Sequence, residues 1–172
     1  MNPSHADVAA AFDRAFAQRA NALACRPRDP SDRTFLLDCA IACSAMHGLL
    51  PDAMLAQQAE FQRAAHDNGF PDAMHRIVTR AGASIGHARI DWTTTDTHLV
   101  DIAVLPEHRG IGAARALLGA WLAVADAHQL SATLQVFIDN PARQIYARLG
   151  FVDSVLDPNA AFIDMRRPPA QV

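Results

Sequence analysis

The chain contains no lysine, and all fifteen of its basic residues are arginines. This absence excludes a Walker-type phosphate loop, in which a lysine reaches the phosphates, and catalysis through a lysine Schiff base. Glutamate occurs only at Glu60 and Glu107, so a glutamate general base has few places to lie. No run of apolar residues approaches the length of about eighteen that reads as a membrane-spanning helix, and we expect no membrane span.

Cysteine is also scarce. The chain has only Cys25, Cys39 and Cys43, and no Cys-x-x-Cys pair. An odd number without that spacing predicts neither a disulfide framework nor a structural zinc site, and we expect no metal. Cys39 and Cys43 lie four residues apart and share a face of a predicted helix, so we interpret them as small buried apolar residues.

The charge pattern shows no cluster of like charges that would attract a charged macromolecule. The formal net charge is −3 and no run of like charge occurs, so we expect no nucleic-acid or membrane partner. The N-terminus lacks a basic region followed by an apolar run, which predicts a cytoplasmic protein without a secretory signal. A length of 172 residues with 51% apolar content fits one main globular domain.

The stretch from 100 to 128 carries the first motif. An apolar strand at 100–105 is followed by the glycine-containing loop 109–112 and by a helix from 113 to 128. Glycines let backbone N–H groups approach a ligand closely, and a helix N-terminus favours negative charge. We therefore expect a phosphorylated ligand at 109–115. A dinucleotide site would need a third glycine where Arg115 lies, and a glycine turn without ligand is the plain alternative.

The rest of the pattern predicts an α+β fold with a mixed, mostly antiparallel sheet of about seven strands, flanked by about four helices. We divide the chain into an extra N-terminal helix at 1–20, a main domain at 21–167 and a frayed tail at 168–172. The first helix either packs on the outside of the domain or forms a dimer interface. The expected strands are 23–26, 74–79, 84–92, 97–105, 132–137, 151–156 and 161–165, with a turn at 157–159 in the closing hairpin. The expected helices are one capped near Ser31 and ending at Gly48, then 51–69, 113–128 and 142–149.

A second motif follows the strand at 132–137. It consists of Asn140, Tyr146 and the pair Gly150-Phe151. Together with Val104-Leu105-Pro106 and the loop Arg109-Gly110-Ile111-Gly112-Ala113-Ala114, it makes the chain resemble the GNAT superfamily of acyl-CoA-dependent N-acetyltransferases. The resemblance covers residues 23–166, and it implies the GNAT-like version of the fold predicted above.

The resemblance implies how acetyl-CoA, the co-substrate, is held. Backbone N–H groups from about Ile111 to Arg115 hold the pyrophosphate, and the pantetheine arm lies like an added strand against 102–104. The strand bulges and splays from the next one, and an N–H near Ala103 or Val104 polarises the thioester carbonyl. The implied coenzyme-binding residues are Ile102, Ala103, Val104, Arg109, Gly110, Ile111, Gly112, Ala113, Ala114, Arg115 and Asn140. Asn140 has the alternative role of a helix N-cap.

Three residues are candidate catalytic groups. Tyr146, the only tyrosine, is the general acid that protonates the departing thiolate, or else a helix residue packed on the sheet. His98 lies where some relatives carry a base, and a solvent-facing strand residue is the alternative. Asp101 is a base, an anchor for the amine, or a partner of an arginine such as Arg89. Gln135 stands where some relatives carry a glutamate base, so a water chain or an already neutral amine stays open.

The function we expect is transfer of an acetyl group from acetyl-CoA to a small-molecule or peptide amine by direct attack in a ternary complex. The alternatives are a non-catalytic acyl-CoA-binding or sensing module and a phosphate-binding protein without coenzyme. The cysteines are far from the motifs in the sequence, so we expect no cysteine acyl intermediate. His47, His66, His75 and His87 show no metal-ligand spacing and are expected mostly at the surface. A homodimer remains open, and the acceptor cannot be read from the sequence.

Overall fold

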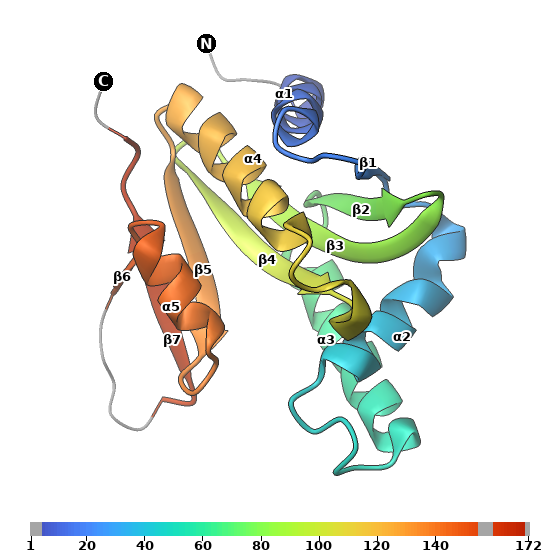
Figure 1. The fold of residues 1–172 in the computed structure, drawn as a ribbon. Coiled ribbons are helices and arrows are strands. Elements are labelled where there is room, and N and C mark those ends of the chain that lie inside the picture. Colours follow the sequence, from blue (N-terminus) through green and yellow to red (C-terminus); the bar gives the residue numbers. More distant parts are fainter. Residues whose placement is uncertain (1–4, 155–159, 171–172) are drawn as a thin grey trace.

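A computed structural model of the chain, which describes residues 5–154 and 160–170, contains a seven-stranded sheet (Figure 1). The spatial order is β1-β2-β3-β4-β5-β7-β6, so β7 lies between β5 and β6. Among the described strand pairs of this sheet, only β4–β5 is parallel, which confirms the predicted mixed, mostly antiparallel sheet and its central meander. The strands are β1 (Ala24–Pro27), β2 (Met74–Arg80), β3 (Ala83–Trp92), β4 (Asp96–Val104), β5 (Ser131–Phe137), β6 (Val152–Asp153) and β7 (Phe162–Arg167).

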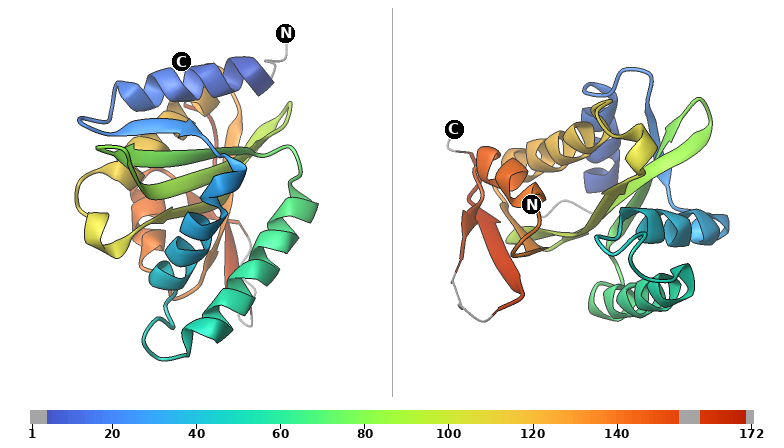
Figure 2. Two further views of the ribbon diagram at one scale, coloured as in Figure 1. Left: turned by 90° about the vertical axis from the view of Figure 1, so that its right-hand side faces the viewer. Right: turned by 60° about the horizontal axis from the view of Figure 1, so that its bottom comes forward.

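Helices cover both faces of the sheet. Figure 2 shows α1, α4 and α5 on one face, and α2 and α3 on the other. None of these helices is both long and apolar enough to cross a bilayer, within the ranges that the structure describes. The bounds are α1 (His5–Ala17), α2 (Arg33–Cys43), α3 (Asp52–Gly69), α4 (Ala113–Ala127) and α5 (Ala142–Arg148), with short 3₁₀ helices η1 (Pro30–Asp32) and η2 (Pro106–His108).

The core lies between the sheet and α4. Apolar side chains recur along α4 at helical spacing, so one broad stripe of the helix is buried. At its centre Trp121 is fully buried, stacks on Phe151 with ring centroids 5.6 Å apart, and donates a hydrogen bond to Thr97 Oγ1 at 3.0 Å. This bond satisfies the buried indole N–H and fixes α4 over β4.

The predicted N-terminal helix is present as α1. Its apolar residues Val8, Phe12 and Phe16 are buried in the same core as α4. Asp13 accepts hydrogen bonds from the Arg76 guanidinium at 2.8 and 3.0 Å, which ties α1 to β2. Because the apolar face of α1 is used within the chain, the arrangement favours packing on the domain over an interface between chains. Residues 1–4 of the predicted helix lie outside the described residues.

The central strands separate part-way along their length. The parallel pairing of β4 with β5 ends at the Leu99–Leu134 pair. The pairing of β4 with β3 slips between Arg89 and Ile90, which leaves Val100 as the extra residue of a β-bulge. Figure 1 shows β4 and β5 diverging beyond this point, toward the loop that precedes α4. The predicted bulge and splay are therefore present in the fold.

The predicted start of the second helix holds within two residues, but its predicted end is wrong. The Asp29 carboxylate accepts the Ser31 N–H at 2.9 Å and starts η1, and α2 follows from Arg33 with Asp32 at its N-cap position. The predicted end at Gly48 is too late, since α2 stops at Cys43. The chain then turns, and Gly48 adopts a left-handed conformation (φ +80°) within the loop rather than at the helix end. The predicted turn at 157–159, the end of the strand at 151–156 and the last two tail residues lie outside the described residues.

Candidate active site

The loop before α4 presents free backbone donors. Gly110 and Gly112 have φ angles of +79° and +88°, which glycine adopts without strain, and nothing lies within 4 Å of a Cβ built on either. No side chain caps the helix at Gly112. In the described part of the chain, the N–H groups of Ala113, Ala114 and Arg115 therefore have no hydrogen-bond acceptor. An exposed, uncapped helix N-terminus behind two open glycines is a ready anion site.

The edge of β4 exposes further donors where β5 has left it. The Leu105 N–H donates to Ile85 O at 2.9 Å, so Leu105 and Ile85 form a hydrogen-bonded pair. In the adjacent pair, Val104 with Gly86, the N–H and C=O of Val104 therefore both point away from β3. Alternation along the strand points the N–H of Ile102 the same way and that of Ala103 toward β3. The free N–H groups in this stretch are thus those of Ile102 and Val104, facing the gap between β4 and β5.

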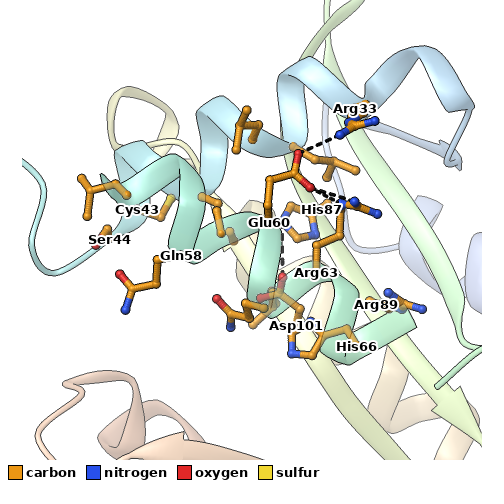
Figure 3. A pocket seen from close by; sticks show the side chains of 18 of the residues that line it. Arg33, Cys43, Ser44, Gln58, Glu60, Arg63, His66, His87, Arg89 and Asp101 are labelled. Atoms are coloured by element: carbon orange, nitrogen blue, oxygen red, sulfur yellow. Dashed lines mark hydrogen bonds and ion pairs between the residues drawn. The ribbon is translucent and has the colours of Figure 1, made fainter. Parts of the chain in front are cut away.

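A pocket of about 390 Å³ lies between the sheet and the helices α2 and α3 (Figure 3). Asp101, Ile102 and Ala103 from β4 form part of its floor, and Asn140 lies at its rim. Asn140 Oδ1 accepts the Ala142 N–H at 2.9 Å, although the N-cap position of α5 is Pro141 and not, as predicted, Asn140. The pocket therefore brings together predicted residues from both sequence motifs.

Asp101 is the carboxylate on this floor. It faces Arg89 in the strand register, but makes no ion pair with it; the ionisable group that lies near it is His87, with Nε2 3.9 Å from Oδ2. His87 is buried and its Nδ1 lies 3.2 Å from Nε2 of His75. Burial lowers the pKa values of His87, His75 and His66, so all three are neutral near pH 7.

The expectation of surface histidines is wrong for His66, His75 and His87, which all line the pocket beneath or along α3. Register pairing of β2 with β3 and the packing of α3 over the sheet bring them together. Within the described ranges, no three potential ligand side chains are arranged to hold a metal ion.

His98 lies apart from Asp101, in the part of β4 that still pairs with β5, and does not line the pocket. Its ring stacks on Phe70 with centroids 5.2 Å apart, and its Nδ1 is 2.9 Å from Thr133 Oγ1. Burial lowers the pKa of His98. Gln135, where some relatives carry a base, donates its amide to Asp164 at 3.1 Å.

Tyr146 lies on α5, on the other side of the gap from Asp101. It is buried at 7% exposure and packs edge-to-face with Phe151, with ring centroids 6.0 Å apart. Burial raises the pKa of Tyr146 to about 12, and the negative charge of Asp101 acts in the same direction. The hydroxyl is therefore protonated near neutral pH, and it has no hydrogen-bond partner among the described residues.

Cys43 was missed by the sequence reasoning. Its Sγ lies 3.3 Å from Val104 O, which also accepts a hydrogen bond from Arg109 Nε at 3.4 Å, so the expectation that all cysteines lie far from the motifs is wrong here. A hydrogen bond from Cys39, with Sγ atoms 4.0 Å apart, lowers the pKa of the Cys43 thiol, and Arg109 adds to this. The bond to Val104 O opposes that shift, because only the thiol can donate it. Sixty-one residues separate Cys43 from Val104, and no local pattern reports such a contact.

Comparison with known proteins agrees with this geometry. Residues 51–166 match the sequence model of a family described as an acetyltransferase (GNAT) domain. Among curated proteins, none matches the chain significantly.

Solved structures match the fold over most of the chain. PaiA N-acetyltransferase from Thermoplasma acidophilum, solved in complex with coenzyme A, has a TM-score of 0.68 at 14% identity, over 86% of this chain and 99% of its own. Ard1 from Thermoplasma volcanium has a TM-score of 0.65 at 19% identity, over 88% and 100% of the two chains. The ribosomal-protein-S18-alanine N-acetyltransferase from Escherichia coli has a TM-score of 0.65 at 17% identity, over 87% and 96%. At these identities the similarity establishes the fold.

Proposed function

The chain belongs to the GNAT acetyltransferase family, and from this premise we propose that it transfers an acetyl group from acetyl-CoA to a primary amine by direct attack in a ternary complex. One observation carries the proposal. The divergence of β4 from β5 leaves the N–H groups of Ile102 and Val104 facing an open edge, at the end of the sheet that leads to the uncapped N-terminus of α4.

These groups fit coenzyme A from one end to the other. The free N–H groups around Gly112 to Arg115 suit the two charges of a pyrophosphate. The edge of β4 suits the two amides of pantetheine, which would add to it like a strand. That PaiA from Thermoplasma acidophilum was solved with coenzyme A supports the assignment. When bound, acetyl-CoA supplies the acetyl group in activated form as a thioester.

The chain's own residues divide the remaining chemistry. The Val104 N–H is placed to stabilise negative charge that develops on the thioester oxygen. Tyr146, protonated because its pKa is about 12, donates to the departing thiolate. Asp101 receives the proton of the amine, and we prefer it to His98 because Asp101 lines the pocket whereas His98 lies outside it with Nδ1 engaged by Thr133.

The test measures two quantities on the purified protein. Calorimetry with acetyl-CoA reports binding, and release of the coenzyme thiol with a broad panel of amines reports transfer. The proposal expects binding in the micromolar range and amine-dependent thiol release that falls sharply in Tyr146→Phe. Binding without transfer to any amine supports a non-catalytic acyl-CoA-binding module instead, and absence of binding contradicts the assignment of the coenzyme site.

A further inference from the structure

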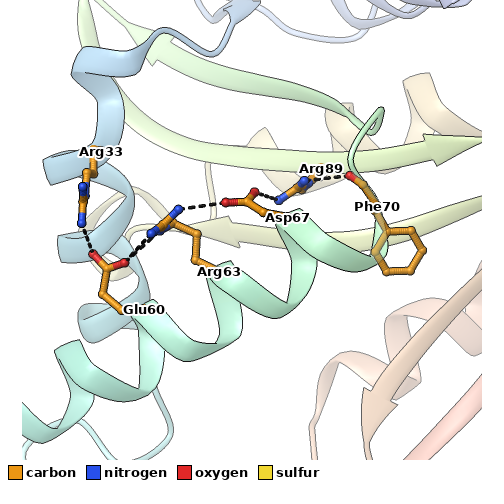
Figure 4. Close-up of polar contacts among 6 residues, drawn as sticks. All are labelled: Arg33, Glu60, Arg63, Asp67, Phe70 and Arg89. Atoms are coloured by element: carbon orange, nitrogen blue, oxygen red, sulfur yellow. Dashed lines mark hydrogen bonds and ion pairs between the residues drawn. The ribbon is translucent and has the colours of Figure 1, made fainter.

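One wall of the pocket carries a continuous chain of ion pairs from α2 to β3 (Figure 4). Successive N···O distances along it are 3.1, 2.7, 2.8 and 2.7 Å, and the last guanidinium also donates to the carbonyl of Phe70 at 2.8 Å. We call this set the arginine network, and its members in order are Arg33, Glu60, Arg63, Asp67 and Arg89.

The arginine network has one positive charge more than it has negative charges, because three guanidiniums share two carboxylates. The two ends of the network differ in exposure. Arg33 at the outer end has 65% of its side chain exposed, so water screens its charge, whereas Arg89 at the inner end has 10% exposed.

Arg89 also has an unused donor. Its two terminal nitrogens donate to Asp67 and to the Phe70 carbonyl, but its Nε–H is buried and has no partner among the described residues. A buried charged donor without an acceptor is costly, since it has lost water and gained nothing in exchange. Arg89 lines the pocket, so a molecule bound there is a candidate source of the missing acceptor.

The opposite charge lies on the neighbouring strand. Asp101 is the cross-strand partner of Arg89, and 39% of its side chain is exposed. No arginine pairs with it in the described structure, and burial lowers the pKa of its neighbour His87, which therefore stays neutral. The pocket thus offers a carboxylate that no arginine contacts and, on the neighbouring strand, a guanidinium that is paired with Asp67 but keeps one donor unused.

This pattern selects among classes of amine. A polyamine or an aminoglycoside-like polycation would place further positive charges against three arginines that line the same pocket. A neutral alkylamine would leave the Arg89 donor unsatisfied. A compound with an ammonium group close to a carboxylate satisfies Asp101 and Arg89 together. Apolar residues of the helical walls, such as Leu36, Leu55 and Ala59, can then contact the remainder of the molecule.

We propose that the acceptor is a small amino acid-like amine, whose amino group lies at Asp101 and whose carboxylate lies at the Nε–H of Arg89. The proposal rests on the proposed acetyl transfer, and it names the substrate class of that same pocket. A pocket of about 390 Å³ accepts a free amino acid more readily than a folded protein segment.

The experiment compares each of the twenty L-amino acids with its own amide, which keeps the amine and side chain and removes the negative charge. Binding is measured by calorimetry on the protein loaded with coenzyme A, and transfer by thiol release with acetyl-CoA. We expect at least one acid to bind, and to be acetylated, about tenfold or more in preference to its amide, which corresponds to about 1.4 kcal/mol. The inference is overturned if transfer occurs but no acid is preferred to its amide, or if only peptide or protein amines are acetylated. Either result leaves the proposed function standing.

Two variants then locate the carboxylate. In Arg89→Met the ratio of acid to amide affinity should fall to near one. Arg33→Met, which removes the exposed arginine of the same network, should keep most of the wild-type preference for the acid. A ratio unchanged in Arg89→Met overturns the assignment to Arg89. The comparison of acids with amides on the unmodified protein decides the substrate class even if Arg89→Met fails to fold.

Discussion

Gly86 on β3 is the position where one methyl group should disturb the proposed thioester site. A Cβ built there would lie 2.6 Å from Ala103 O, 3.1 Å from Val104 Cγ2 and 3.2 Å from Val104 Cα. All three atoms belong to β4, which is held by its register with β3. Gly86→Ala therefore forces β4 away from β3 by several tenths of an ångström, at the residue whose N–H faces the gap.

Two opposing terms set the size of the effect on stability. Overpacking a well-filled site costs about 1–3 kcal/mol. Replacing glycine by alanine reduces the entropy of the unfolded chain, which returns about 0.5–1 kcal/mol. The free energy of unfolding should thus fall by about 1 kcal/mol, within a range of about 0–2.5 kcal/mol. The activity loss should be larger in proportion, about tenfold or more in kcat/KM, since a shift of about 1 Å in a reacting group can cost about a hundredfold.

Urea unfolding and initial rates of acetyl-CoA turnover measure the two effects. Gly69→Ala is the matched control, because a Cβ there has nothing within 4 Å and φ lies outside the left-handed region. The control should unfold at or above the wild-type urea concentration and keep full activity. If Gly86→Ala matches wild type in both measurements, then β3 and β4 are not closely fitted at Val104 and the reasoning about that N–H fails.

Three further predictions concern single side chains. Tyr146→Phe should lower kcat by about a hundredfold and leave acetyl-CoA affinity within about twofold, as measured by initial rates and calorimetry; equal losses in both would point to a structural role. Iodoacetamide near pH 7 should modify Cys43 ahead of Cys25, because Cys39 and Arg109 lower the pKa of Cys43 while burial raises the pKa of Cys25 to about 12. Peptide mass spectrometry identifies the modified cysteine, and bound coenzyme A should slow its modification. The Arg26 guanidinium, 2.6 Å from the Asp32 carboxylate, lowers the pKa of Asp32 to about 2. The stabilisation of the fold by this ion pair is therefore full above the pKa of Asp32 in the unfolded chain and is lost as the pH falls from about 4 to about 2. Because Arg26 is 41% exposed, we expect the ion pair to contribute only about 1–2 kcal/mol to the free energy of unfolding. Urea unfolding of Asp32→Asn should therefore depend less on pH than that of the wild type over that window.

The sequence predicted those features that short-range patterns determine. Alternation of apolar residues located β2, β3 and β4, and the helical period located α1, α3 and α4 within a few residues of their observed ends. Gly110 and Gly112 adopt positive φ angles that glycine tolerates without strain, and the sequence pattern already located both in the loop before α4. The resemblance then supplied the splay of β4 from β5, which no local pattern contains.

Contacts between distant segments could not be predicted. His75 and His87 look like surface residues in alternating strands, and only the register of β2 against β3 pairs their rings beneath α3. Cys43 meets Val104 because α2 crosses the face of β4 and ends there, so its position depends on where the helix stops. The sequence offers Asp101 as a partner of Arg89, but its freedom from Arg89 depends on Asp67, which lies on another element.

The central claim is that the gap between β4 and β5 holds an acetyl donor whose acetyl group moves to an amine bound over Asp101. Mass spectrometry of a panel of amines after incubation with acetyl-CoA tests this most directly. The account predicts that at least one amine gains a single acetyl group on nitrogen, with an equal amount of free coenzyme thiol, and that Asp101→Asn and Tyr146→Phe each reduce the yield. Tight binding of acetyl-CoA with no acetylated amine in any class, or transfer that both variants leave unchanged, would contradict it.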